Sequence, residues 1–195
     1  ELTKLRQICC DPHLHYADYK AGSAKLDTCM ELVHGALDGG HRILLFSQFT
    51  GMLDIIGKRL AKEDIAFLKL TGASSKESRA KMVAQFQAGE VPVFLISLKA
   101  GGVGLNLTAA DVVIHYDPWW NVAAQDQATD RAHRIGQQHT VTVYKLIAKD
   151  TIEERIMQMQ ESKRDLVNSV LGGDGISSAL FTREDVLALL GGDGR

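Results

Sequence analysis

The sequence lacks the features that mark membrane and secreted proteins. Its 195 residues include only three cysteines and three prolines, and aromatic residues make up 6%. No apolar run approaches the length of a membrane span, and no secretory signal opens the chain. Cys9, Cys10 and Cys29 are too few, and odd in number, for a disulfide framework, so reduced thiols are expected.

The charge balance gives no bulk signal for a nucleic-acid partner. Lysine and arginine number 22 against 24 acidic residues, which leaves a net charge of −2. Any contact with DNA must therefore come from a local patch. The apolar and charged fractions, 45% and 24%, are ordinary for a globular protein. One domain with appendages is expected at this length.

Two stretches imitate ligand-binding motifs. The segment from Cys9 to His15 gathers two cysteines and two histidines, but the spacings match no common zinc pattern and no second ligand pair follows. The segment from Gly51 to Lys58 imitates a phosphate loop, yet five residues separate its glycines and it has a helical pattern. Neither stretch predicts a ligand site.

Apolar runs alternate with helical patterns along the chain, which predicts an α/β domain with a mostly parallel sheet. Strands are expected at 42–47, 65–70, 93–96, 112–116 and 141–146. Helices are expected before Pro12, over 24–37, over 52–60, after Ser74, after Asn121 and from 151 to about 170. Ser23 is a predicted N-cap, and capping boxes are predicted for Ser74 with Glu77 and Thr151 with Glu154.

One stretch, from Val93 to Gln137, concentrates groups suited to phosphate chemistry. A glycine-rich turn, 97–104, follows a predicted strand, where open α/β sheets place ligands and where glycines let backbone amides approach a phosphate. Arg131 and Arg134 are three apart and are expected on one helix, so both guanidinium groups can reach a developing γ-phosphate charge. A solvated helix face with salt bridges to Asp126 or Asp130 is the alternative.

Alternatives also exist for the glycines and the tryptophans. The turn could serve only an unusual backbone path, or a dinucleotide fingerprint, although Gly102 and Gly104 lack the third glycine and the acidic partner. Trp119 and Trp120 cannot easily both point inward from a loop. One of them is therefore a candidate for stacking on nucleic acid or for insertion as a wedge.

Two strings carry a family resemblance. Ser97-Leu-Lys-Ala-Gly-Gly-Val-Gly-Leu-Asn-Leu107 resembles the fifth helicase motif of the Swi/Snf-type DNA translocases, in helicase superfamily two, and Asp126-Gln-Ala-Thr-Asp-Arg-Ala-His-Arg-Ile-Gly-Gln137 resembles the sixth. Segments 46–49 and 70–79 resemble further motifs, so the resemblance covers nearly the whole chain. It implies the C-terminal RecA-like lobe, with residues 1–22 as interlobe linker, 23–150 as the lobe, and 151–195 as brace helix, glycine-rich linker and short terminal helix.

The resemblance also implies roles for single residues. It implies phosphoryl-transfer roles for Gln127, Arg131 and Arg134, and ATP contacts for Gly102, Gly104, Asp130, Arg131 and Arg134. It implies DNA contacts for Ser47, Gln48, Ser97, Lys99, Ala100, Gly101, Trp119, Trp120 and Asn121. The family usually has proline after the asparagine, whereas this chain has Val122, so a less constrained loop is expected.

The function implied by the resemblance is that of a second motor lobe. Neither Gly-x-x-x-x-Gly-Lys-Ser/Thr nor an acidic magnesium motif occurs in the chain, so ATP with Mg²⁺ is expected to be held mainly by a first lobe. Because the chain begins with Glu1, we expect it to be a piece of a longer protein. Expected partners are double-stranded DNA, bound without sequence readout, the first lobe of the same polypeptide, and nucleosomes or other DNA-bound proteins.

Rival functions follow from the same residues. They are a non-catalytic interaction or regulatory module that kept the fold, a dinucleotide-dependent oxidoreductase, and a strand-separating helicase of the same superfamily. The expected compartment is the nucleus in a eukaryote and the cytoplasm or nucleoid in a prokaryote.

Overall fold

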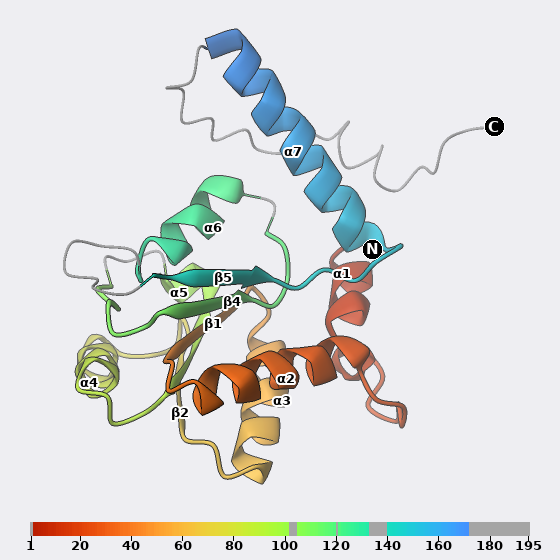
Figure 1. Ribbon diagram of the computed structural model, residues 1–195. Helices are drawn as coiled ribbons and strands as arrows, with labels where there is room; N and C mark the ends of the chain where they lie inside the picture. The colour runs from red at the N-terminus through yellow and green to blue at the C-terminus, as the bar shows by residue number, and fades with distance from the viewer. Residues whose placement is uncertain (1, 102–104, 120, 133–139, 172–195) are drawn as a thin grey trace.

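A computed structural model of the chain shows a five-stranded sheet with helices on both faces (Figure 1). The structure describes residues 2–101, 105–119, 121–132 and 140–171. The strands are β1 (Ile43–Ser47), β2 (Phe67–Leu70), β3 (Val93–Ser97), β4 (Val112–His115) and β5 (Thr142–Lys145). The helices are α1 (Leu2–Cys10), the short 3₁₀ helix η1 (Pro12–Leu14), α2 (Ala24–Asp38), α3 (Thr50–Lys62), α4 (Lys76–Gln87), α5 (Leu98–Gly101), α6 (Val122–Thr129) and α7 (Ile152–Leu171).

The sheet is parallel throughout, in the order β2-β3-β1-β4-β5. Ser47 at the end of β1 is in register with Ser97 at the end of β3, and Phe46 is in register with His115 of β4. The carboxyl ends of the central strands therefore lie together at one edge, where open α/β sheets bind ligands. This arrangement confirms the predicted α/β fold.

The core has two parts, one on each face of the sheet. Leu45 packs with residues of α2 and α3, whereas its neighbours Leu44 and Phe46 pack with residues of α4, α5 and α6. Strands β1, β3 and β4 are buried along their whole length because helices cover both faces. Burial on both faces explains why these strands have continuous apolar sequences instead of alternating ones. The edge strand β5 is exposed at every residue.

The predicted helix starts are confirmed at α2 and shifted at α4. The Ser23 hydroxyl accepts from the Leu26 N–H, as an N-cap does. At α4 the N-cap is Ser75 instead of the predicted Ser74. The Ser74 hydroxyl accepts from the backbone N–H of Thr71 and closes the preceding turn, so the helix begins one residue later and the predicted capping box is wrong.

Helix α7 spans nearly the predicted residues. It projects away from the sheet, and α1 lies beside its first turn (Figure 1). Thr151 accepts from the Glu153 N–H at 3.2 Å, as a capping residue does. Glu154, however, accepts from the N–H of Asp150 at 2.8 Å, one residue before the position that the capping box predicts. Among the described residues, no helix is both long and apolar enough to span a bilayer.

Candidate nucleotide and nucleic-acid site

A pocket of about 400 Å³ opens at the carboxyl edge of β1, β2 and β3. Its lining comes from the ends of these strands and from the start of α3: Gln48, Thr50, Asp54, Lys69, Thr71, Gly72, Ala73 and Ser97. Two of the predicted DNA-contact residues, Gln48 and Ser97, therefore share one pocket. No role was predicted for the lining residues Thr50, Asp54 and Lys69, although the neighbouring segment 70–79 resembles a family motif.

Helix α3 begins at this pocket with unusual capping. Its N-cap residue, Phe49, has no side chain able to cap the helix, and Thr50, the first helical residue, lines the pocket. The first N–H groups of a helix lack intrahelical acceptors and carry the positive end of the helix dipole. An uncapped helix start beside a polar pocket favours a phosphate or another anion.

Two of the predicted DNA-contact residues are buried serines that serve the loops around them. Ser47 is 0% exposed and Ser97 is 2% exposed. The Ser47 hydroxyl donates to the Asp117 carboxylate at 2.5 Å, and the Ser97 hydroxyl accepts from the Ala100 N–H at 3.3 Å. The hydroxyl of Ser47 therefore supports the loop between β1 and α3.

The turn after β3 continues as the short helix α5, which includes the predicted residues Lys99, Ala100 and Gly101. Ala100 is 2% exposed, and its carbonyl accepts from the guanidinium of Arg79 at 3.2 Å. Arg79 comes from α4, so the two family-like segments contact each other. The predicted nucleotide contacts Gly102 and Gly104 lie outside the described residues.

The loop after β4 carries both tryptophans that were predicted to contact nucleic acid, and the structure describes one of them, Trp119. Trp119 is half-buried against the core on the α4–α6 face of the sheet. Its backbone N–H donates to the side-chain oxygen of Gln125 at 3.2 Å. This packing favours a core role for Trp119 over contact with nucleic acid. Asn121 is half-buried immediately before α6, and its carbonyl accepts from the Gln125 N–H. Trp120 lies outside the described residues.

The arginine segment departs from the predicted helix. Helix α6 ends at Thr129, and Arg131 lies in the turn that follows, so the prediction of one helix face for both arginines is wrong at Arg131. The N–H of Arg131 bonds the carbonyl of Ala128 three residues back, and its own carbonyl accepts from the Leu107 N–H at 3.0 Å. This tertiary contact draws the chain out of the helix. Arg134 lies outside the described residues.

The side chains around this turn differ in exposure. Arg131 is 3% exposed, so the protein holds its guanidinium in place. Gln127, predicted to act in phosphoryl transfer, and Asp130, predicted to contact ATP, are exposed to solvent on either side of the end of α6. Helix α6, which precedes the arginine turn, lies beside α5, which follows β3. The structure thus brings together segments that the sequence separates by some thirty residues.

A buried histidine ties the end of α6 to the sheet. His115, the last residue of β4, makes a 2.9 Å hydrogen bond through Nε2 to the Thr129 hydroxyl and stacks on Phe46 with ring centroids 5.4 Å apart. Burial lowers the pKa of His115 to about 4, so the ring is neutral at physiological pH. A neutral ring fits its stacked position in the core.

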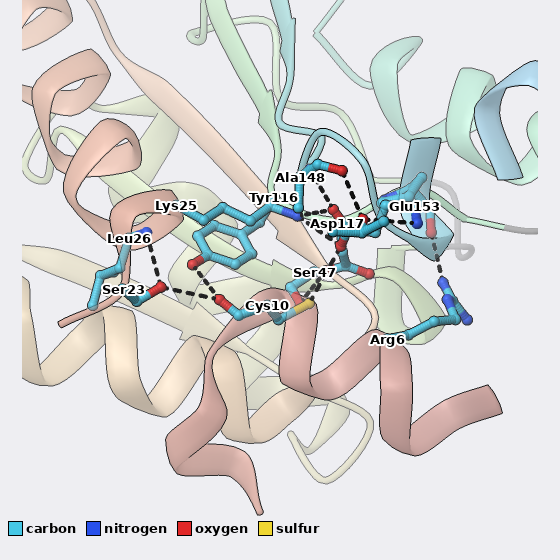
Figure 2. A network of polar contacts seen from close by, with 12 residues as sticks. Arg6, Cys10, Ser23, Lys25, Leu26, Ser47, Tyr116, Asp117, Ala148 and Glu153 are labelled. Carbon is cyan, nitrogen blue, oxygen red and sulfur yellow. Dashed lines mark hydrogen bonds and ion pairs between the residues drawn. The ribbon is translucent and has the colours of Figure 1, made fainter. Parts of the chain in front are cut away.

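A network of buried charged and polar side chains joins α1, α2 and α7 beside Tyr116, the residue that follows β4 (Figure 2). The Lys25 ammonium donates to both Glu153 oxygens at 2.7 and 2.5 Å, and Glu153 also accepts from the Ala148 N–H at 2.9 Å. Lys25 lies 5.2 Å from the centroid of the Tyr116 ring, and the Tyr116 hydroxyl donates to the Cys10 carbonyl at 3.0 Å. Sequence reasoning missed this network entirely.

The described residues contain no cluster of three or more His, Cys, Asp or Glu side chains that could hold a metal ion. Cys9 and Cys10 belong to α1, and burial raises the pKa of both thiols. The predicted phosphate contacts among the described residues include backbone N–H groups, the side-chain amide of Gln48 and the guanidinium group of Arg131. Such hydrogen-bond donors suit anions.

The chain thus combines a parallel sheet, a pocket at the carboxyl edge of this sheet and a turn after α6 that carries Arg131. The helicase conserved C-terminal domain matches residues 24–136. The chain belongs to this family, and it is a RecA-like C-terminal lobe of the Swi/Snf type in helicase superfamily two.

Individual relatives agree with this class. The chain is 43% identical over 189 residues to an uncharacterized ATP-dependent helicase of Mycoplasma pneumoniae, which covers 96% of this chain and 18% of that protein. It is 44% identical over 152 residues to the chromatin-remodeling ATPase INO80 of Homo sapiens, with 77% of this chain and 10% of that protein covered. The chain thus spans less than a fifth of the length of these curated relatives.

Solved structures agree on the fold. The SWI2/SNF2 ATPase C-terminal domain of Sulfolobus solfataricus matches with a TM-score of 0.69 and 36% identity, over 91% of this chain and 72% of that one. The core of the SWI2/SNF2 ATPase of the same organism, in complex with double-stranded DNA, matches with a TM-score of 0.73 and 38% identity, over 89% of this chain and 37% of that one.

Proposed function

We propose that this chain is the second motor lobe of an ATPase that translocates on double-stranded DNA and remodels protein–DNA complexes. The observation that carries the proposal is the pocket at the carboxyl edge of the sheet, beside the uncapped start of α3. Its lining offers small polar groups, the start of a helix and the Lys69 ammonium, which pairs with Asp54. Helix N–H groups and an ammonium suit the phosphate backbone and read no base sequence. The DNA complex of the Sulfolobus solfataricus core supports this partner.

The nucleotide side of the proposal rests on the arginine turn. ATP binds between this lobe and a first lobe, and the Arg131 and Arg134 guanidinium groups stabilise the charge that develops on the γ-phosphate. Arg131 is held by its surroundings next to α5, which suits a group that must be in place before the transition state. Gln127 and Asp130 are exposed and can meet the facing lobe.

Magnesium is held by the first lobe in this proposal. Among the residues described for this lobe, no carboxylate cluster suits a metal ion. Closing of the two lobes over ATP and reopening after hydrolysis then move the lobes along one DNA strand. Helix α5 contacts both β3, whose last residue lines the pocket, and α6, which precedes the arginine turn, so a change at the nucleotide can alter the grip on DNA.

Displacement of a third strand from a DNA triplex by the full-length protein tests the proposal. Translocation on duplex DNA predicts ATP-dependent release of the third strand together with DNA-stimulated ATP hydrolysis, without separation of the duplex. Separation of the duplex strands indicates a helicase in the strict sense. DNA binding without hydrolysis or release indicates a non-catalytic module, and either result contradicts the proposal.

A further inference from the structure

Asp117 is a buried carboxylate whose hydrogen bonds converge on one dipeptide. It follows β4 and is 1% exposed. The Ser47 hydroxyl donates to Oδ1 at 2.5 Å, and the Gln48 backbone N–H lies 3.3 Å from each carboxylate oxygen. The Gln48 side-chain amide also donates to Oδ2. Every one of these donors comes from the loop between β1 and α3 that borders the pocket.

This convergence fixes three consecutive residues of the loop. The Gln48 amide donates a further bond to the Pro118 carbonyl at 3.1 Å, and the Ser47 hydroxyl accepts from the Phe49 N–H at 3.1 Å. Burial raises the pKa of Asp117, and the hydrogen bonds from Ser47 and Gln48 oppose this shift because they stabilise the ionised carboxylate. The carboxylate therefore sets the backbone at the point where α3 begins and where Gln48 lines the pocket.

Arg6 of α1 contacts both the loop after β4 and the loop between β1 and α3. Arg6 is 4% exposed, and its guanidinium donates to the Pro118 carbonyl at 2.6 Å. The guanidinium also lies 5.7 Å from the centroid of the Phe49 ring. Figure 2 shows Arg6, Asp117 and the Lys25–Glu153 pair gathered around the end of α1. Four buried charged side chains thus lie near the loop between β1 and α3: Asp117, Glu153, Arg6 and Lys25.

We propose that Asp117 is a positioning residue for the DNA-backbone contact: its carboxylate holds Ser47 and Gln48 so that the pocket and the start of α3 face the phosphate. The inference rests on the proposed function, since it assigns a role at the same pocket. Asp117 itself is buried and touches no substrate. Its effect on DNA passes through the loop that it holds.

The test is Asp117→Asn in the full-length protein, with Asp111→Asn as the matched control. Asp111 precedes β4 as Asp117 follows it, and its carboxylate accepts from the Arg42 N–H at 3.0 Å and pairs with His41 at the opposite edge of the sheet. The asparagine in Asp117→Asn replaces one carboxylate oxygen with an N–H₂ group, which cannot accept a hydrogen bond. The hydrogen bonds that this oxygen accepts from the Ser47–Gln48 segment are therefore lost. Half-saturating duplex DNA concentration for ATPase stimulation and turnover at saturating DNA are measured for each variant.

We expect Asp117→Asn to raise the half-saturating DNA concentration about tenfold, the effect of losing a charge-assisted hydrogen bond. Turnover at saturating DNA should stay within about twofold of the parent, because the arginine turn is untouched. Asp111→Asn should change neither quantity. A merely structural role would lower the active fraction, and hence turnover, without moving the half-saturating concentration.

A double-mutant cycle with Gln48→Ala separates positioning from direct contact. If Asp117 acts through Gln48, the shift in half-saturation from Asp117→Asn should shrink at least severalfold in the Gln48→Ala background. Ser47→Ala is the second variant should Asp117→Asn fail to fold, and it should shift half-saturation in the same direction. An unchanged half-saturation in Asp117→Asn and Ser47→Ala, or fully additive effects in the cycle, overturns the inference. A parent protein whose ATPase ignores DNA overturns the proposed function instead.

Discussion

Lys25→Met is the perturbation whose cost follows most directly from the structure. The substitution keeps the length and the apolar stem of the side chain but leaves Glu153 without its ammonium partner. The side chains of Lys25 and Glu153 are 8% and 1% exposed, so water cannot replace the lost partner. Removing one member of a buried ion pair costs about 3 to 5 kcal/mol in free energy of unfolding. For a chain of this length that corresponds to a drop in Tm of roughly 6 to 20 °C.

The exposed pair of Lys69 with Asp54 provides the control. These side chains are 40% and 52% exposed, and such pairs contribute at most about 1 kcal/mol. Denaturant unfolding of the 195-residue chain, with Lys25→Met and Lys69→Met side by side, measures both free energies. Equal losses in the two variants, or a loss below about 1 kcal/mol for Lys25→Met, would refute the importance of the buried pair.

The pH dependence of the same variant follows from Glu153. Burial raises the pKa of Glu153, and the Lys25 ammonium opposes this shift, so Lys25→Met raises that pKa further. A carboxyl group with a raised folded-state pKa stabilises the fold below its unfolded-state pKa, and that contribution is lost as pH rises through the folded-state value. The deficit of Lys25→Met should therefore be largest near neutral pH and should shrink toward acidic pH. A deficit that grows on acidification contradicts the assignment.

Three further outcomes are expected. Leu45→Ala, in the central strand, should cost about 2 to 5 kcal/mol in chemical unfolding, because the side chain is 0% exposed; a loss below about 1 kcal/mol would contradict the packing. The chain alone should show no ATPase activity, because it carries no phosphate loop; robust DNA-stimulated turnover by the purified lobe would contradict this. Lys99→Ala in the full-length protein should weaken DNA binding equally across sequences and reduce the salt slope by about one, as a phosphate contact does; sequence-selective loss would count against it.

The layered fold could be predicted from the sequence because its strands are unusually apolar. Burial on both faces gives each central strand a continuous run, such as Val93–Ile96, and such runs are visible without an alignment. The ends of elements were less predictable. Ser74 and Ser75 are equally good caps in sequence, and only the bond from Thr71 to Ser74 decides between them.

The segments that form the candidate site could be predicted from the sequence, but their arrangement in space could not. The carboxyl edge of the sheet follows from strand order, and Gln48 and Ser97 meet there. The turn at Arg131 could not be foreseen, because a contact with Leu107 ends the helix. The Lys25–Glu153 pair spans 128 residues of sequence, so each member looks like an ordinary surface charge until the fold brings them together.

The proposed function requires this lobe to supply arginines to the transition state of ATP hydrolysis. DNA-stimulated turnover, ATP affinity and thermal melting of Arg134→Ala and Arg131→Lys in the full-length protein test it. Lysine is chosen at 131 because the side chain is 3% exposed, and lysine keeps the charge while losing the bidentate fork. We expect turnover to fall by about a thousandfold in Arg134→Ala, with the melting temperature and ATP affinity nearly unchanged in both variants. Near-normal turnover per folded molecule in both variants would contradict it.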